Sequence, residues 1–308
     1  MEYFDLHCDT LTEAFTQDCA LMENSLQLSL KRGSYLRPWF QCFAVWLPDD
    51  IRGKDAERYF QRAAEKFQRE LALHPQELLF CKTGEQLLQA REKGKIGALL
   101  TVEGGGILGG KLENIDAFYE QGVRMMTLTW NGPCELGDGV MVPNPSGLTD
   151  FGRRAVHRME ELGMVIDVSH ASEPLFAEVA AITKRPFIAT HSNSKKLCDH
   201  PRNLTDEQFC VIRDRGGLVG LNFYPTFLET SGKATMDSIV KHAEHFLALG
   251  GAHTLALGSD FDGAQLPEDM TGIESVERLY ETFLRHNYKE STVNAIFFEN
   301  AYEFFRSL

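Results

Sequence analysis

The sequence has no long apolar run. No stretch approaches the roughly 18 apolar residues that a membrane-crossing helix requires. The N-terminal residues MEYFDLHCDT lack the basic and apolar segments of a secretory signal, and the C-terminal residues AYEFFRSL lack the hydrophobic tail of a lipid-anchor signal. From these absences we expect a cytoplasmic protein with no membrane partner.

Positive charge and paired cysteines are also scarce. Lys and Arg number 31 against 44 Asp and Glu, which gives a formal net charge of −13. A nucleic-acid partner needs a basic face, so we exclude one. The seven cysteines are odd in number and none stands in a C-x-x-C pair. This usage predicts reduced thiols and neither a disulfide framework nor a thiolate zinc cluster.

Short apolar segments alternate with longer helical patterns along the whole chain. Segments rich in Val, Ile, Leu and Phe predict eight strands, near residues 3–7, 40–46, 97–102, 124–129, 164–169, 186–190, 217–223 and 254–259. Helical patterns are predicted at 55–73, 84–93, 113–121, 149–162, 172–183, 205–215, 236–249, 274–286 and 290–306. Eight strand–helix units in a chain of this length favour a closed (β/α)8 barrel of the TIM type, with an open doubly wound sheet as the second choice. No linker or repeat interrupts the pattern, so we expect residues 1–308 to form one domain.

Side chains that are able to bind a metal stand where predicted strands end. They are His7 and Asp9 after the first strand, Glu103 after the third, His170 after the fifth and His191 after the sixth. The carboxyl ends of barrel strands meet around one axis, so these side chains are expected to converge. Each histidine alone is more typical of a structural residue. Together the five supply enough ligands for two metal ions about 3.5–4 Å apart, and histidine with carboxylate suits zinc, cobalt or manganese better than magnesium.

Further polar and aromatic residues follow the later strands. Asp260, in L-G-S-D-F-D-G, is placed to take a proton from a metal-bound water and pass it to a leaving amine. Asp262 with Gly263 is more typical of a turn. Arg202, in D-H-P-R-N, has the chemistry to clamp a substrate carboxylate, although most arginines are surface residues. Tyr224 follows the seventh strand and is either a pocket residue or a rim tyrosine.

The ordered set of motifs resembles the membrane (renal) dipeptidase family, the zinc dipeptidases of the amidohydrolase-type barrels. The motifs are D-L-H-C-D-T, V-E-G-G, I-D-V-S-H-A-S, T-H-S-N-S, H-P-R-N, N-F-Y and G-S-D-F-D-G, and the match spans residues 3–306. No single motif is specific, but their order is. The chain looks like a bacterial-type member because the secretory and anchor segments of the animal enzymes are absent.

This resemblance implies a metallodipeptidase with two zinc ions per chain. It puts His7 and Asp9 on one zinc, His170 and His191 on the other, and Glu103 between them. It also implies cleavage of L-L and L-D dipeptides by a metal-bridging hydroxide, and a homodimer.

The resemblance assigns roles to three more residues. Asp260 is implied in proton transfer, Arg202 in holding the C-terminal carboxylate, and Tyr224 in shaping the pocket. One position departs from the pattern: the animal enzymes carry a histidine that contacts the substrate's carbonyl oxygen, and T-L-T-W-N places Trp130 there. Loss of such a donor costs about 10²–10³ in rate, so we regard Asn131 as a candidate replacement.

Two other functions stay open at this point. Gly104, Gly106 and Gly109 have the G-x-G-x-x-G spacing of a dinucleotide site. An NAD-binding oxidoreductase is disfavoured, because Glu103 would repel the pyrophosphate and no acidic residue ends the next strand. Trp130 also leaves room for a binuclear metal hydrolase that acts on another small amide.

Overall fold

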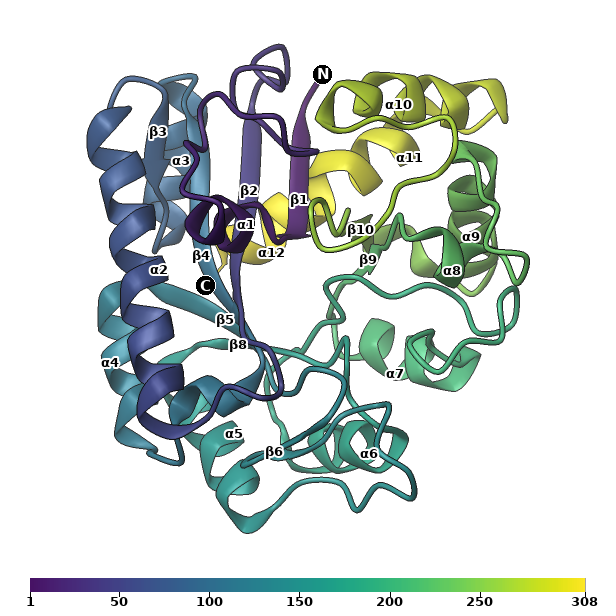
Figure 1. Cartoon of the computed structure of the whole chain (residues 1–308). Coiled ribbons are helices and arrows are strands. Elements are labelled where there is room, and N and C mark those ends of the chain that lie inside the picture. Colours follow the sequence, from purple (N-terminus) through teal and green to yellow (C-terminus); the bar gives the residue numbers. More distant parts are fainter. Residues whose placement is uncertain (308) are drawn as a thin grey trace.

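The computed structural model describes residues 1–307, and its centre is a curled sheet whose strand pairings are all parallel (Figure 1). In spatial order the curled path is β8 (Val165–Asp167), β5 (Val123–Thr127), β4 (Ile96–Glu103), β2 (Trp39–Trp46), β1 (Tyr3–Cys8), β10 (Leu255–Leu257) and β9 (Val219–Leu221). A further strand, β3 (Leu78–Phe80), pairs with the start of β4 outside this path.

The two ends of the path approach each other through residues 187–190. Parallel bridges join Asp167 to Ile188 and Ala189 to Val219. The segment therefore lies between β8 and β9, where the predicted sixth strand belongs, although it is too irregular to be a regular strand. The fold is the predicted barrel of the TIM type, and the open doubly wound sheet is wrong.

Helices surround the sheet (Figure 1). They are α2 (Gly53–Leu73), α3 (Gly84–Glu92), α4 (Glu113–Gln121), α5 (Asp150–Leu162), α6 (Glu173–Ile182), α7 (Asp206–Asp214), α9 (Met236–Ala248) and α10 (Val276–Arg285). All eight were predicted to within a few residues. In α2 the buried side chains Ala56, Phe60, Ala63 and Phe67 recur three or four positions apart, the spacing of one helix face.

The elements that the sequence patterns missed are short. They include α1 (Thr10–Thr16), α8 (Pro225–Leu228), β3, and a hairpin of β6 (Pro133–Cys134) and β7 (Gly137–Asp138). Except for β3, each follows the carboxyl end of a barrel strand. Segments of two to seven residues are too short for a periodic pattern to identify them.

The C-terminal residues pack on the amino end of the barrel. The predicted helix at 290–306 consists of α11 (Glu290–Asn294), a π-helical turn (Ala295–Glu299) and α12 (Asn300–Arg306). Aromatic rings from this region pack against rings from the strands. The ring centroids of Phe305 and Phe4 lie 5.4 Å apart, and so do those of Tyr302 and Phe40. Burying each ring contributes about 1.5–3 kcal/mol. These contacts cover the amino ends of β1 and β2.

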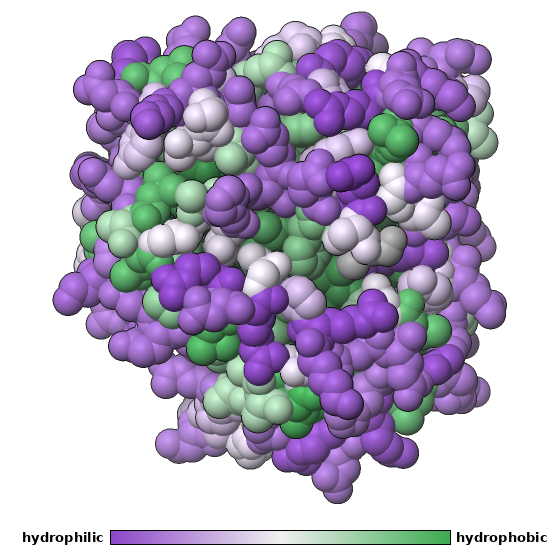
Figure 2. All heavy atoms as spheres, turned by 180° about the vertical axis from the view of Figure 1, so that it is seen from behind, coloured by the Kyte–Doolittle hydropathy of each residue, from purple (hydrophilic) through white to green (hydrophobic). Residues whose placement is uncertain are grey.

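Within residues 1–307, no helix combines the length and the apolar character needed to cross a membrane. All seven cysteines are free thiols, as predicted. Polar residues cover much of the face in Figure 2, where apolar side chains appear in separate groups. The apolar side chains of the chain thus serve mainly its core.

Candidate active site

The carboxyl end of the barrel brings the five predicted ligand residues together. His7 lies in β1 and Asp9 follows it, Glu103 ends β4, His170 follows β8, and His191 follows the segment between β8 and β9. All five are buried, with exposed fractions between 1% and 6%. Parallel strands that end at one rim explain why residues so far apart in the sequence meet here.

Glu103 stands between two groups of ligand atoms. Its Oε2 lies 3.4 Å from His7 Nε2, and its Oε1 lies 2.7 Å from His170 Nε2 and 3.5 Å from His191 Nε2. One set of atoms within 4.8 Å of one another comes from His7, Asp9 and Glu103, and another comes from Glu103, His170 and His191. The carboxylate thus faces one group with each of its oxygens.

The electrostatics of the cluster fit divalent cations. His7 Nε2 and Asp9 Oδ1 are buried without a hydrogen-bond partner, which is costly unless an ion compensates them. Burial and the neighbouring Glu103 carboxylate raise the pKa of Asp9 to about 7. Burial lowers the pKa of both His170 and His191, which keeps these imidazoles in the neutral form that binds metals.

Two of the imidazoles are held at the nitrogen that faces away from the cluster. His170 Nδ1 lies 3.0 Å from Asn131 Oδ1, and His191 Nδ1 lies 2.7 Å from the Thr190 hydroxyl. The Thr190 hydroxyl donates in turn to the buried Asp167, at 2.7 Å. A proton on each Nδ1 therefore satisfies these acceptors and leaves Nε2 free as a ligand atom. The structure thus places the side-chain amide oxygen of Asn131 against His170.

Arg202 lies inside the site beside His170. It is only 3% exposed, and its Nη2 lies 3.0 Å from His170 Nε2. The guanidinium also donates to the Ser169 carbonyl and lies over the ring of Phe227, 5.3 Å from its centroid. Burial lowers the pKa of Arg202 to about 10, so the side chain stays cationic at neutral pH. Its buried Nε has no hydrogen-bond partner.

The two predicted acidic residues after the last strand differ in surroundings. Asp260 Oδ1 lies 3.8 Å from His7 Nε2, and Asp260 has a left-handed backbone, with φ at +62°. Asp262 shares this backbone, with φ at +70°, so the difference lies in the partners of the two carboxylates. Asp262 instead accepts hydrogen bonds from the Thr10 hydroxyl at 2.6 Å and the Gln27 amide at 2.5 Å. Its carboxylate therefore links the segment after β10 to Thr10 and Gln27.

The cluster lines a cavity of about 700 Å³. Trp46 and Trp130 pack edge to face in its wall, with ring centroids 5.0 Å apart. Tyr224 and Phe227 line it together with Arg202, and their rings also meet edge to face, at 4.8 Å. All the residues that the sequence predicted for the site thus lie at this cavity or directly beneath it.

The lining residues that were not predicted include Trp46, Phe227 and Met141. Trp46 ends β2 and pairs in register with Glu103, so the strand-end rule that found the ligands would also have found it. Phe227 lies in the short helix α8, and Met141, which is 49% exposed, lies in the irregular segment after β7. Neither position carries a periodic signal.

The glycines that follow β4 serve backbone packing. A Cβ atom on Gly105 would lie 2.4 Å from the carbonyl oxygen of Leu128. Gly104 and Gly109 have φ values of +103° and +58°, which glycine adopts without strain. The left-handed backbone therefore accounts for Gly104 and Gly109, two of the three glycines that in sequence resemble a dinucleotide fingerprint.

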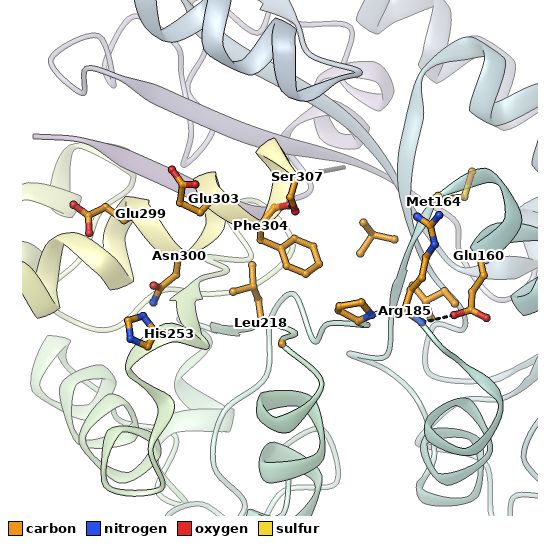
Figure 3. A pocket seen from close by; sticks show the side chains of 15 residues that line it. Glu160, Met164, Arg185, Leu218, His253, Glu299, Asn300, Glu303, Phe304 and Ser307 are labelled. Carbon is orange, nitrogen blue, oxygen red and sulfur yellow. Dashed lines mark hydrogen bonds between the residues drawn. The ribbon is translucent and has the colours of Figure 1, made fainter.

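A second cavity, of about 550 Å³, lies at the opposite end of the barrel (Figure 3). Arg185, Leu218, His253 and Phe304 are among its lining residues, and Glu160 lies beside Arg185 at one side of it. The carboxylate of Glu160 is engaged by the Arg185 backbone amide, at 2.8 Å. In the part of the chain that the structure describes, none of the sets of metal-capable atoms includes a residue of this cavity.

Comparison with known proteins identifies a family. The sequence model of the membrane dipeptidase family (peptidase family M19) matches residues 1–308. An uncharacterised protein from the pqqA 5′ region of Klebsiella pneumoniae is 35% identical over 233 residues, covering 72% of this chain and 86% of that protein. Dipeptidase 3 of Mus musculus is 27% identical over 276 residues, covering 87% of this chain and 55% of the mouse protein. The crystal structure of a metallopeptidase from Rhodobacter sphaeroides, liganded with a phosphinate mimic of the dipeptide L-Ala-D-Ala, has a TM-score of 0.92 and 25% identity and covers 98% of each chain.

Proposed function

The chain belongs to the membrane dipeptidase family, peptidase family M19, and is a metal-dependent dipeptidase, and we propose that it uses two zinc ions to hydrolyse L-L and L-D dipeptides. In this proposal the cluster around Glu103 holds both ions. The observation that carries the proposal is the position of Glu103, which turns one oxygen toward His7 and the other toward His170. A buried carboxylate between two groups of ligand atoms suits a pair of cations.

The donor types support zinc. Three imidazole nitrogens with carboxylate oxygens are ligands that zinc accepts, whereas magnesium prefers oxygen ligands alone. In this proposal His7 and Asp9 hold one ion, and His170 and His191 hold the other. When bound, such a pair polarises the scissile carbonyl and lowers the pKa of a water.

Arg202 is proposed to bind the C-terminal carboxylate of the dipeptide. Its buried Nε has a free donor, and a charge-assisted hydrogen bond to a carboxylate is strong where water is excluded. Phe227 and Tyr224 meet edge to face beside it and shape this end of the cavity. The C-terminal residue of the substrate would therefore lie between Arg202 and these rings.

Asp260 is proposed to move the proton. Its Oδ1 points toward the cluster, 3.8 Å from His7 Nε2, where an attacking water would be placed. In this role the carboxylate accepts a proton from the water as oxygen attacks the carbonyl carbon, and then delivers it to the departing amine nitrogen. The carboxylate is thereby regenerated after each turnover.

Trp130 bears on the choice of substrate. Its indole packs on Trp46 in the cavity wall, with its ring centroid 6.4 Å from that of His170. The Rhodobacter relative binds a mimic of L-Ala-D-Ala, which supports L-D dipeptides as substrates here. A hydrolase for another small amide is the alternative that this bulky wall residue favours.

Amino-acid release from a panel of L-L and L-D dipeptides by zinc-loaded protein tests the proposal. A sample treated with a chelator serves as the control. Release that the chelator removes is expected, and the panel ranks the substrates. Protein that binds two zinc ions per chain and releases no amino acid would overturn dipeptide hydrolysis and favour another amide.

A further inference from the structure

Asn222, the residue after β9, is fully buried beside the candidate active site. Its Nδ2 donates a hydrogen bond to Asp260 Oδ2 at 3.0 Å. Its Oδ1 accepts one from the backbone amide of Tyr224 at 2.6 Å. One side chain thus joins the residue proposed for proton transfer to a residue of the pocket wall.

The neighbours of Asn222 fix which way its amide points. The Tyr224 backbone N–H is a donor, so the atom that faces it has to be the amide oxygen. The amide nitrogen is then turned toward Asp260, whose carboxylate oxygens accept hydrogen bonds. The same nitrogen lies 3.4 Å from the carbonyl oxygen of His191, a second acceptor. The opposite orientation would place the amide oxygen of Asn222 against the Asp260 carboxylate and the His191 carbonyl oxygen, which are both acceptors.

This contact gives the two oxygens of Asp260 different surroundings. Oδ2 is held by Asn222, and Oδ1 is left toward the cluster, 3.8 Å from His7 Nε2. The left-handed backbone of Asp260 is unfavourable by itself, so surrounding hydrogen bonds have to maintain it. One of these is the Asn222 amide, and another is the bond from the Asp260 backbone N–H to the His7 carbonyl, at 3.1 Å.

We propose that Asn222 is a positioning residue for Asp260: its amide nitrogen holds Oδ2, so that Oδ1 is presented to the attacking water. The inference rests on the proposed role of Asp260 in proton transfer. Misplacing a catalytic group by a fraction of an ångström slows the chemical step while substrate binding continues. The effect of losing Asn222 should therefore fall on kcat.

Asn193 provides a matched control. It is also fully buried, and it pairs reciprocally with Asn222: its Oδ1 accepts from the Asn222 backbone amide at 3.0 Å, and its Nδ2 donates to the Asn222 carbonyl at 2.9 Å. Its side-chain hydrogen bonds in the described part of the chain do not include Asp260. Replacing either asparagine by aspartate removes one buried amide donor, but only Asn222→Asp removes the donor to Asp260.

The experiment compares zinc-loaded wild-type protein with Asn222→Asp and Asn193→Asp on one dipeptide. We expect Asn222→Asp to lower kcat by about 100-fold, the scale of a general-base contribution, with KM changed by less than about threefold. Zinc content and the affinity for a phosphinate dipeptide mimic should match those of the wild type. Asn193→Asp should lower the Tm by a similar amount and kcat by less than about tenfold. If Asn222→Asp does not fold, Asn222→Ala removes the same donor without adding charge.

A double-mutant cycle separates this role from a purely structural one. Asn222→Asp combined with Asp260→Asn exchanges the two groups and restores an amide–carboxylate pair. If Asn222 acts through Asp260, the second substitution should add less than about threefold to the loss in Asp260→Asn alone. An additive loss, an equal loss in Asn193→Asp, or a normal kcat in Asn222→Asp would overturn the positioning role. Wild-type turnover by Asp260→Asn alone would instead remove Asp260 from the mechanism, and Asn222's role with it.

Discussion

Glu103 Oε1 lies 2.7 Å from His170 Nε2, closer than any other carboxylate–imidazole pair in the cluster. Glu103 ends β4 and His170 follows β8, and β5 lies between these strands in the sheet. The contact therefore reaches across the mouth of the barrel. Burial raises the pKa of Glu103, but the neighbouring imidazoles, His7 first among them, outweigh burial and keep that pKa well below its usual range.

Replacing Glu103 by Gln should remove metal from the protein and abolish turnover. The substitution removes the negative charge shared by the two groups of ligand atoms and leaves one oxygen where there were two. We expect at least one of the two zinc ions to be lost and kcat to fall by more than about 100-fold. Metal analysis of the dialysed protein and a dipeptide assay measure both effects. Glu113→Gln, on the outer helix α4, is the control. A variant with both metals and full rate would exclude the bridging role.

Replacing Asp260 by Asn should leave the metals in place but remove most of the activity. The amide retains the shape of the side chain and cannot take a proton from water, so a loss of about 10²–10⁴ in kcat is expected. Zinc content and kcat are measured on the same sample. Unchanged turnover would show that another group moves the proton.

Trp130→His tests whether the tryptophan is part of a dipeptide site. If dipeptides are the native substrates, the cavity wall formed by Trp130 and Trp46 suits them. The substitution should then lower kcat/KM for dipeptides, or change it by less than about tenfold. The full dipeptide panel, assayed with both proteins, gives this comparison. A large gain in dipeptide turnover would indicate that the native substrate is a different amide.

His242 should make stability depend on pH. It is buried between the segment that carries Arg202 and the helix α8: its Nδ1 accepts from the Ser194 amide at 3.0 Å, and its Nε2 donates to the Leu228 carbonyl at 2.9 Å. Both bonds need the neutral ring, and burial lowers the pKa of His242 below its usual value. The unfolded chain therefore binds this proton more readily, and the free energy of unfolding should fall as the pH drops below about 6.5.

Urea unfolding at about pH 7.5 and pH 5.5 measures this dependence. His242→Gln, which does not titrate, is the comparison, because other buried histidines titrate in both proteins. The wild type should lose more stability on acidification than the variant does. An equal loss in the two proteins would assign the dependence to other groups.

The sequence was sufficient to predict the barrel and the convergence of the candidate ligand residues at its carboxyl end, because the strand ends of a parallel barrel meet around one axis. Glu103 and His191 illustrate this: each follows an apolar segment, and the two meet at 3.5 Å. Asn222 was not predicted, since its importance depends on side-chain orientation and on its distance to Asp260. The sixth strand was predicted as regular, but Pro186 has no N–H to donate, and only bridges form at Ile188 and Ala189. The single domain, the homodimer and the cytoplasmic location stay predictions.

Zinc titration of the metal-depleted protein measures how many zinc ions dipeptide hydrolysis requires. Amino-acid release from one L-L and one L-D dipeptide is followed while zinc is added in steps. The additions run from zero to about four equivalents per chain, roughly twice the capacity of a two-metal site. If two zinc ions act together, release begins with zinc and reaches its plateau at about two equivalents per chain. A plateau at one equivalent, or release that persists without metal, would contradict it.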